Sequence, residues 1–178
     1  MKYIFVSDIH GNVDRLKEIV EIFNKEAADR LVILGDTCAY LSKNSDEEMA
    51  EVLNSMKDKI EMIRGNCDTR SFEEMLQFEM FDMDNIYANG KIITVTHGHY
   101  YNSSELPYNC GEIFIQGHTH VPILKKDKDR IFANPGSVSR PRGVDLRCYI
   151  LVNESKIALK TLEMKLVKEI LFEDVENE

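Results

Sequence analysis

The sequence has no long hydrophobic run. A helix that crosses a bilayer needs about 18 or more consecutive apolar residues, and no segment approaches that length. The opening residues are apolar only at 3–6, which is too short for the apolar region of a secretory signal. These absences predict a cytoplasmic protein that does not associate with membranes.

Cysteine is scarce and widely spaced. No C-x-x-C pair occurs, so the spacing of a zinc finger is absent. In a cytoplasmic protein, isolated cysteines are expected to be reduced thiols. The four positions are Cys38, Cys67, Cys110 and Cys148.

The chain also lacks an excess of positive charge. Lysine and arginine total 22 against 31 aspartates and glutamates, which gives a net charge of −9. Non-specific nucleic-acid binding needs a basic surface, so we expect neither nucleic acid nor an anionic membrane as a partner. An acidic chain remains compatible with a phosphate-ester site in which metal ions supply the positive charge.

What is present describes an ordinary globular protein. The chain has 178 residues, of which 43% are hydrophobic and 30% charged, and this length suits one domain with a substantial core. There is no linker, repeat or low-complexity segment. We therefore predict a single domain over 1–178.

The first half of the chain alternates between strand and helix patterns. Short apolar runs predict buried strands at 3–6, 31–34 and 60–63. Helices are predicted near 13–26, from the SDEE capping box at 45–48, and from SFEE at 71–74. This βαβαβ order favours a parallel sheet.

The second half predicts mostly strands. Residues 85–97 form a hairpin pattern around an Asn89-Gly90 turn. Further strands are predicted within 112–117, 121–126, 130–136, 147–153, 156–164 and 167–173. Parallel strands followed by antiparallel ones suggest two stacked sheets with helices outside.

Polar residues suited to metal binding follow the predicted strands. All five histidines of the chain lie in these strand-end segments, and ligands of open α/β sheets bind beyond the carboxyl ends of strands. Each histidine alone is ordinary on a surface or in a core, but the set together predicts a metal centre. The ligands that it predicts are Asp8, His10, Asp36, Asn66, His97, His118 and His120, and His99 lies beside them in the same segment as His97.

The ligand types narrow the chemistry of this centre. Carboxylate, amide and imidazole groups suit manganese best, with nickel, iron, zinc, cobalt or magnesium as alternatives. Seven ligands exceed the needs of one catalytic metal and fit two ions that share a bridging carboxylate. Two such ions stabilise the attacking and leaving oxygens of phosphoryl displacement and activate a water.

The ordered motifs resemble the calcineurin-like metallophosphoesterases. They are D-I-H at 8–10, G-D at 35–36, G-N-C-D at 65–68, T-H-G-H at 96–99 and G-H-T-H at 117–120. The segment NPGSVSRPRG at 134–143 extends the resemblance to the small YfcE-like phosphodiesterases of bacteria and archaea.

The resemblance implies a fold and a division of the ligands. The expected fold is a four-layer αββα sandwich of two mixed sheets flanked by helices. The implied protein is a cytoplasmic enzyme that acts on small phosphodiesters and forms a homo-oligomer, either a dimer or a tetramer. In its active site, Asp36 would bridge two divalent metals. One metal would be held by Asp8, His10 and His120, and the other by Asn66, His97 and His118.

Cys67 departs from the superfamily pattern, in which a histidine that assists the leaving group usually follows the asparagine. The cysteine is open to four interpretations: a nucleophile, a metal ligand, a residue beside the scissile phosphate, or a small residue in a tight turn. A thiol near its usual pKa of about 8.5 is mostly neutral at pH 7 and is a modest general acid.

Four other residues have two interpretations each. His99 is a proton donor or substrate-orienting group, or it packs in its loop. Asp68 holds a ligand histidine through its ring N–H, or it shapes the turn. Arg140 and Arg142 fork onto a phosphate, or they lie in a solvated turn.

The function predicted from the sequence is metal-dependent hydrolysis of phosphodiesters by an activated water, with Cys67, His99 and Asp68 as catalytic candidates. One alternative is a phosphomonoesterase or nucleotidase with the same centre. Another is a protein-interaction scaffold that retains the metal site.

Overall fold

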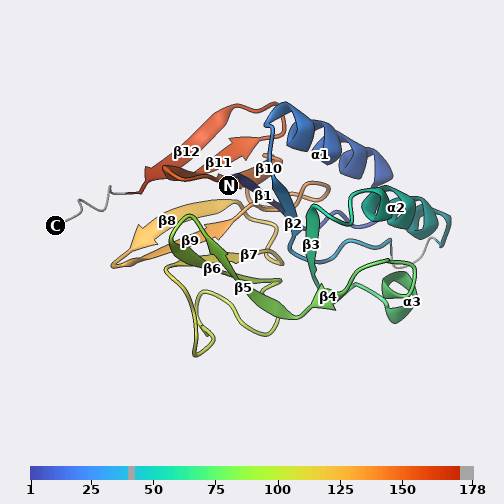
Figure 1. Ribbon diagram of the computed structural model, residues 1–178, viewed down its shortest axis with the longest axis horizontal. Helices are drawn as coiled ribbons and strands as arrows, with labels where there is room; N and C mark the ends of the chain where they lie inside the picture. Colours follow the sequence, from blue (N-terminus) through green and yellow to red (C-terminus); the bar gives the residue numbers. More distant parts are fainter. Residues whose placement is uncertain (40–42, 173–178) are drawn as a thin grey trace.

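Two stacked β-sheets form the centre of the protein (Figure 1). The computed structural model describes residues 1–39 and 43–172. The larger sheet has seven strands in the order β12-β11-β10-β1-β2-β3-β4, and β1 to β4 run parallel. Their bounds are β1 Tyr3–Val6, β2 Arg30–Ile33, β3 Ile60–Ile63, β4 Met80–Phe81, β10 Cys148–Val152, β11 Lys156–Thr161 and β12 Leu166–Leu171.

The smaller sheet has five strands in the order β5-β6-β7-β9-β8. Strands β6, β7 and β9 are parallel, while β5 and β8 pair antiparallel at the two edges. The bounds are β5 Met83–Ala88, β6 Lys91–Thr96, β7 Ile113–Gln116, β8 Ile123–Asp127 and β9 Arg130–Asn134. In the β5–β6 turn, Asn89 and Gly90 have φ of 54° and 76°, which is the type I′ geometry that this dipeptide favours.

The core between the sheets comes from the inward-facing residues of both. Phe5 and Val32 of the larger sheet belong to the same buried cluster as Val95 and Ile115 of the smaller one. Strands such as β1 are buried on both faces, because helices cover their other side. This explains the continuous apolar runs in the sequence.

The helices of the described residues pack on the outer face of the seven-stranded sheet (Figure 1). They are α1 Val13–Lys25, α2 Lys43–Ser55 and α3 Arg70–Glu73. Asn12 caps α1 by accepting a hydrogen bond from the Arg15 N–H. Leu16, Ile19 and Phe23 then repeat at helical spacing and bury one face.

The outer face of the five-stranded sheet is covered differently. The 97–112 connection lies on it, with the Ser103 N–H donating to Gln116 and the Gly111 N–H donating to Thr94. Within the described residues this layer holds no helix. The predicted sandwich of two mixed sheets is confirmed, and its fourth layer is an irregular segment.

Two local predictions differ from the structure. Helix α2 begins at Lys43 rather than at the capping box, because Asp46 accepts a hydrogen bond from the Ala39 N–H and so anchors the preceding loop. The two-residue strand β4 was not predicted. Glu173, at the end of the last predicted strand, lies outside the described residues. None of the described helices has the length and apolar character to span a bilayer.

Candidate metal centre

Five strand ends bring the predicted ligands together. Strands β1, β2 and β3 run parallel in one sheet, and β6 and β7 run parallel in the other. Backbone hydrogen bonds then join their loops: the His10 N–H donates to Asp36 O, and the Gly117 N–H donates to His97 O. Parallel topology and these cross-links place the loops at one edge of the sandwich.

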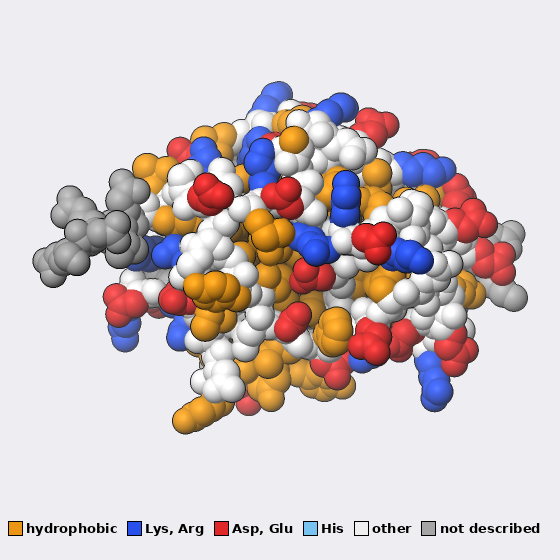
Figure 2. Space-filling view, in the orientation of Figure 1, with side chains coloured by type: hydrophobic (Ala, Val, Ile, Leu, Met, Phe, Trp, Pro, Cys, Tyr) orange, Lys and Arg blue, Asp and Glu red, His pale blue; other side chains and the backbone are white. Residues whose placement is uncertain are grey.

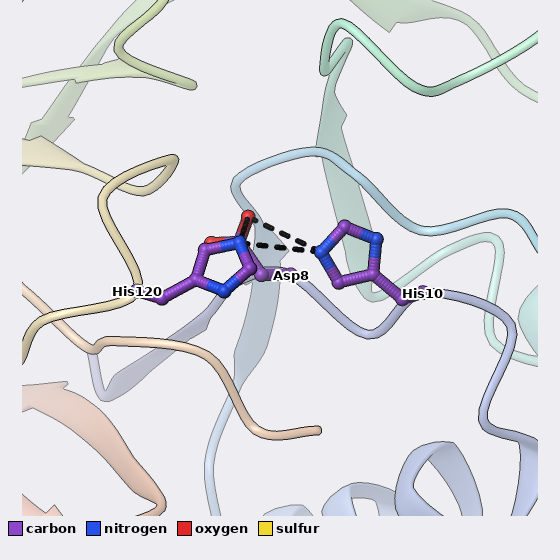
Figure 3. A group of neighbouring side chains, drawn as sticks. All are labelled: Asp8, His10 and His120. Atoms are coloured by element: carbon purple, nitrogen blue, oxygen red, sulfur yellow. Dashed lines mark hydrogen bonds and ion pairs between the residues drawn. The ribbon is translucent and has the colours of Figure 1, made fainter. Parts of the chain in front are cut away.

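Asp8, His10 and His120 form one group (Figure 3). Asp8 Oδ1 lies 3.1 Å from His120 Nε2 and 3.8 Å from His10 Nε2. The two Nε2 atoms are 3.3 Å apart. The rings approach from different loops, and each directs a nitrogen toward the same carboxylate.

Asp36 lies between this group and a second one. Its Oδ2 is 4.0 Å from His10 Nε2, and its Oδ1 is 3.4 Å from His97 Nε2. Asn66 Oδ1 is 3.2 Å from the same nitrogen of His97. The two carboxylate oxygens of Asp36 therefore face different imidazoles, as a bridging ligand requires.

Backbone carbonyls orient two of the imidazoles. His97 Nδ1 is 2.7 Å from Leu34 O, and His120 Nδ1 is 2.7 Å from Arg140 O. A carbonyl only accepts, so each Nδ1 carries the proton and donates it. The neutral ring then keeps a free lone pair on Nε2, which is the form that binds a metal.

The charges of the site suit a cation. Burial alone would raise the pKa of Asp36, but the contact with His97 and the Cys67 N–H outweigh it and hold that pKa well below its usual range. Asp36 is therefore ionised at neutral pH. Asp8 Oδ1 is buried and has no hydrogen-bond partner, although buried carboxylate oxygens are normally paired. Two carboxylates that face the Nε2 atoms of three imidazoles make a ligand set that fits divalent metal ions.

His118 stands at the margin of this arrangement. Its ring meets the ring of His97 edge-on at 5.1 Å between centroids, and its side chain is exposed. The backbone N–H of His118 donates to Asp8 Oδ2 at 3.1 Å. The residue thus contributes its backbone to one group and its ring to the neighbourhood of the other.

The backbone is strained at several of these residues. Five site residues have the left-handed φ that non-glycine residues rarely adopt: Asp8 (58°), His10 (51°), Asp36 (51°), His118 (66°) and His120 (63°). Such conformations cost free energy and cluster at functional sites, where surrounding contacts hold them. Here Ser137 Oγ and Ser139 Oγ donate to the carbonyls of Asp8 and Ile9.

Cys67 and Asp68 take different positions in the G-N-C-D turn. The Cys67 thiol belongs to a ligand-forming group with His10 and Asp36. The Asp68 carboxylate accepts backbone N–H groups from Thr37, Cys38 and Gly65 at 2.7–3.0 Å. Asp68 therefore ties the loop after β2 to the loop after β3, while backbone carbonyls receive the ring N–H groups of His97 and His120.

His99 and the two arginines lie around the centre. The His99 ring is 5.3 Å from the ring of His97, and burial together with the charges of His97 and His118 lowers the pKa of His99. Burial lowers the pKa of His10, and the charge of Arg140 adds to that lowering, whereas the contact with Asp8 raises the pKa of His120 and the charge of Arg142 opposes it. Both guanidinium groups are therefore close enough to influence the site.

The anchoring groups were not identified from the sequence. Leu34 O and Arg140 O act through the backbone, which any residue type supplies, so no sequence signal marks them. Ser137 and Ser139 did carry a signal: two hydroxyls at alternate positions follow a Pro-Gly turn. The structure uses both hydroxyls to hold the loop after β1.

Several known proteins are similar to this chain in sequence and in fold. The family model described as the calcineurin-like phosphoesterase superfamily domain matches residues 1–156. Phosphodiesterase YfcE of Escherichia coli (strain K12) is 31% identical over 170 residues, which cover 91% of this chain and 92% of that protein. The solved structure of YfcE, a phosphoesterase from E. coli, matches with a TM-score of 0.87 and 28% identity over 96% of this chain and 98% of that one. Phosphodiesterase MJ0936 of Methanocaldococcus jannaschii is 23% identical over 180 residues, or 97% of this chain and 100% of that protein.

Proposed function

The chain belongs to the calcineurin-like phosphoesterase superfamily, and on that premise we propose that it is a phosphodiesterase that uses two divalent metal ions. The observation that carries the proposal is the convergence of the Nε2 atoms of His10 and His120 on the buried Oδ1 of Asp8, at 3.8 Å and 3.1 Å. The names of the relatives YfcE and MJ0936 support phosphodiesters as the substrate class.

Each ion has its own set of residues in this proposal. Asp8, His10 and His120 hold the first, in keeping with their mutual distances. Asn66, His97 and His118 hold the second, and Asp36 bridges. When bound, the two ions act as Lewis acids toward the phosphate and lower the pKa of the attacking water. Manganese is our first choice among the metals that these ligands suit.

The remaining residues orient the substrate and move protons. Arg140 and Arg142 bind phosphate oxygens, and their influence on His10 and His120 supports a place beside the ions. His99 is neutral near pH 7 and interacts with the substrate on the His97 side. Cys67 lies beside the scissile phosphate as a neutral group, and Asp68 positions it by fixing the turn.

The partners follow from the charge and the fold. On the face drawn in Figure 2, basic and acidic side chains are interspersed and no basic patch stands out. The net charge of −9 supports a small diester as substrate, rather than a nucleic acid or a membrane. We also propose a single domain over 1–178, a cytoplasmic location and a homo-oligomer. The cysteines form no disulfide within the described residues, which is in keeping with a reducing compartment.

The test is metal-dependent hydrolysis of bis(4-nitrophenyl) phosphate. We expect turnover with added Mn²⁺, its loss on chelation, and its recovery when the metal is restored. The turnover of Asp36→Ala should fall to that of the chelated protein. Asp58→Ala is the matched control, because Asp58 is exposed and precedes β3 at the end opposite Asn66.

Two outcomes would contradict the proposal. One is the absence of metal-dependent turnover, and the other is an Asp36→Ala variant that matches the parent. Faster turnover of 4-nitrophenyl phosphate than of the diester would instead assign the same centre to a phosphomonoesterase. Metal binding without turnover of either ester would favour the scaffold.

A further inference from the structure

A row of aromatic rings in tilted contact leads from the metal centre to the surface. The ring centroid of His99 is 5.3 Å from that of His97, and the ring centroid of Tyr100 is 4.0 Å from that of His99. The Tyr100 side chain is exposed, with 65% of the residue accessible to solvent. Tyr100 therefore presents an aromatic surface one ring away from a predicted metal ligand.

The position of His99 depends on this packing. Its Nδ1 is buried and has no hydrogen-bond partner, so no bond to that nitrogen fixes the ring as carbonyls fix His97 and His120. The rings of His97, His118 and Tyr100 are its aromatic neighbours. Tyr100 is the nearest of these rings to His99, and it leaves most of its own surface uncovered.

An exposed tyrosine is unremarkable alone, so its location carries the argument. A phosphate held between the two groups of ligands must direct its ester groups outward, past the rim of the site. An aromatic ring at that rim offers a stacking surface to any flat group. An aliphatic ester group of the same size gains only ordinary contact there.

We propose that the His99–Tyr100 ring pair is a subsite for a flat aromatic group carried by the phosphodiester. This proposal rests on the proposed function and narrows it: the preferred substrates are diesters with a nucleoside or aryl group, and simple alkyl diesters are poorer. The small apolar and π surface suits a single ring system, and the net charge of −9 disfavours a long polyanion.

The test compares two stable ligands by titration calorimetry on the manganese-loaded protein. Benzylphosphonate and cyclohexylmethylphosphonate carry the same anionic group and rings of the same carbon number, and their C–P bonds resist hydrolysis. We expect benzylphosphonate to bind about tenfold more tightly, within the range measured for stacking on aromatic side chains. Tyr100→Leu should bring the two affinities within twofold, and Tyr100→Phe should keep the preference.

The matched control is Tyr87→Leu. Tyr87 is 75% exposed and pairs with Ile92, at the end of the β5–β6 hairpin away from His97. The Tyr87→Leu variant should leave the preference for benzylphosphonate over cyclohexylmethylphosphonate unchanged. Equal affinities in the parent, or a preference that survives Tyr100→Leu, would overturn the subsite.

Methylphosphonate separates the two levels of the proposal. If it binds the loaded protein while the benzyl preference is absent, only the subsite is wrong. If no phosphonate binds, and the diester assay also shows no metal-dependent turnover, both the subsite and the proposed function are wrong.

Discussion

At the scale of single residues, Cys67 is held tightly against the centre. Its N–H donates to Asp36 Oδ1 at 2.8 Å, and its Sγ accepts from Asn66 Nδ2 at 3.4 Å. Burial and then the neighbouring carboxylate of Asp36 raise the pKa of the thiol to about 12. A thiol with that pKa is neutral throughout the range in which enzymes work, which argues against a thiolate nucleophile.

We predict that Cys67→His keeps metal binding and changes turnover mainly for poor leaving groups, because an imidazole is the better proton donor near pH 7. The measurement compares kcat for aryl diesters whose phenols differ in pKa, together with Mn²⁺ affinity by calorimetry. Cys110→Ser is the control, since Cys110 hydrogen-bonds in the 97–112 connection. If Cys67→Ala abolished diester hydrolysis while metals remained bound, the thiol would have a direct part in the reaction.

Gly65 has no room for a side chain. A Cβ there would overlap the backbone nitrogen and Oδ1 of Asp36. We predict that Gly65→Ala lowers the free energy of unfolding by about 2–3 kcal/mol and weakens Mn²⁺ binding, as measured by urea denaturation and calorimetry. Gly90→Ala has open space and only left-handed strain, so it should cost about 1–2 kcal/mol and leave the metal affinity unchanged.

Residue types and spacing predicted the side chains near the centre. They did not divide those side chains into two groups; the grouping of Asp8, His10 and His120, which lie together in the structure, came from the family resemblance. The carbonyl anchors could not be predicted in this way. Nor could the tilted ring contact between Tyr100 and His99, since neighbours in sequence often point apart and only the loop conformation brings their rings together.

At the scale of elements, a buried polar contact joins α1 to the seven-stranded sheet. Glu26 caps the end of α1 and accepts a hydrogen bond from the Tyr149 hydroxyl of β10 at 2.6 Å. The same carboxylate pairs with Lys160 of β11. Burial raises the pKa of Glu26, but these two partners outweigh it, so the net pKa is lower than usual.

We predict that Glu26→Gln lowers the free energy of unfolding by about 1–2 kcal/mol at pH 7. Because the pKa of Glu26 is lower in the folded state, its contribution is complete above the unfolded pKa of about 4.5. The contribution is lost as pH falls through the folded pKa. Urea denaturation at pH 7 and pH 3 should therefore show a gap between variant and parent that closes in acid.

Glu154→Gln provides the control for this prediction. The Glu154 side chain is 84% exposed, and exposed substitutions usually change stability by less than about 0.5 kcal/mol. A gap for Glu26→Gln that stayed constant down to pH 3 would show that lost packing, and not charge, accounts for the effect.

Element types were predictable from the sequence wherever one pattern dominated. The strands at 3–6 and 60–63 match β1 and β3 residue for residue. The start of α2 was misplaced because Asp46 serves the preceding loop. A helical fourth layer was expected from the family resemblance. The 97–112 connection, which covers that face of the five-stranded sheet, shows no helical periodicity in its sequence.

At the scale of the whole molecule, the centre joins the two sheets. Asp8 and Asp36 follow strands of the seven-stranded sheet, while His97 and His120 follow strands of the five-stranded one. Ions bound between them would cross-link the sandwich at one edge. Stability and metal binding are therefore expected to be linked.

We predict that Mn²⁺ at about 100 times its Kd stabilises the fold by about 2.7 kcal/mol for each site that it fills, which raises the Tm of a chain of this size by about 5–10 °C per site. Chelation should reverse the shift, and Asp36→Ala should show none, while Asp58→Ala should respond like the parent. Thermal denaturation followed by circular dichroism measures it. An equal shift in Asp36→Ala would place the binding elsewhere.

The left-handed backbone at the five site residues has an evolutionary consequence. Glycine adopts that conformation freely, whereas other residues lose on the order of 1 kcal/mol in it. A library selected only for heat resistance in the presence of a chelator should accumulate glycine at His10 and His118, because the side chains of Asp8, Asp36 and His120 hydrogen-bond to the backbone. The same library under selection for growth on a phosphodiester should retain the original site residues, so the two selections would favour different residues at the same positions.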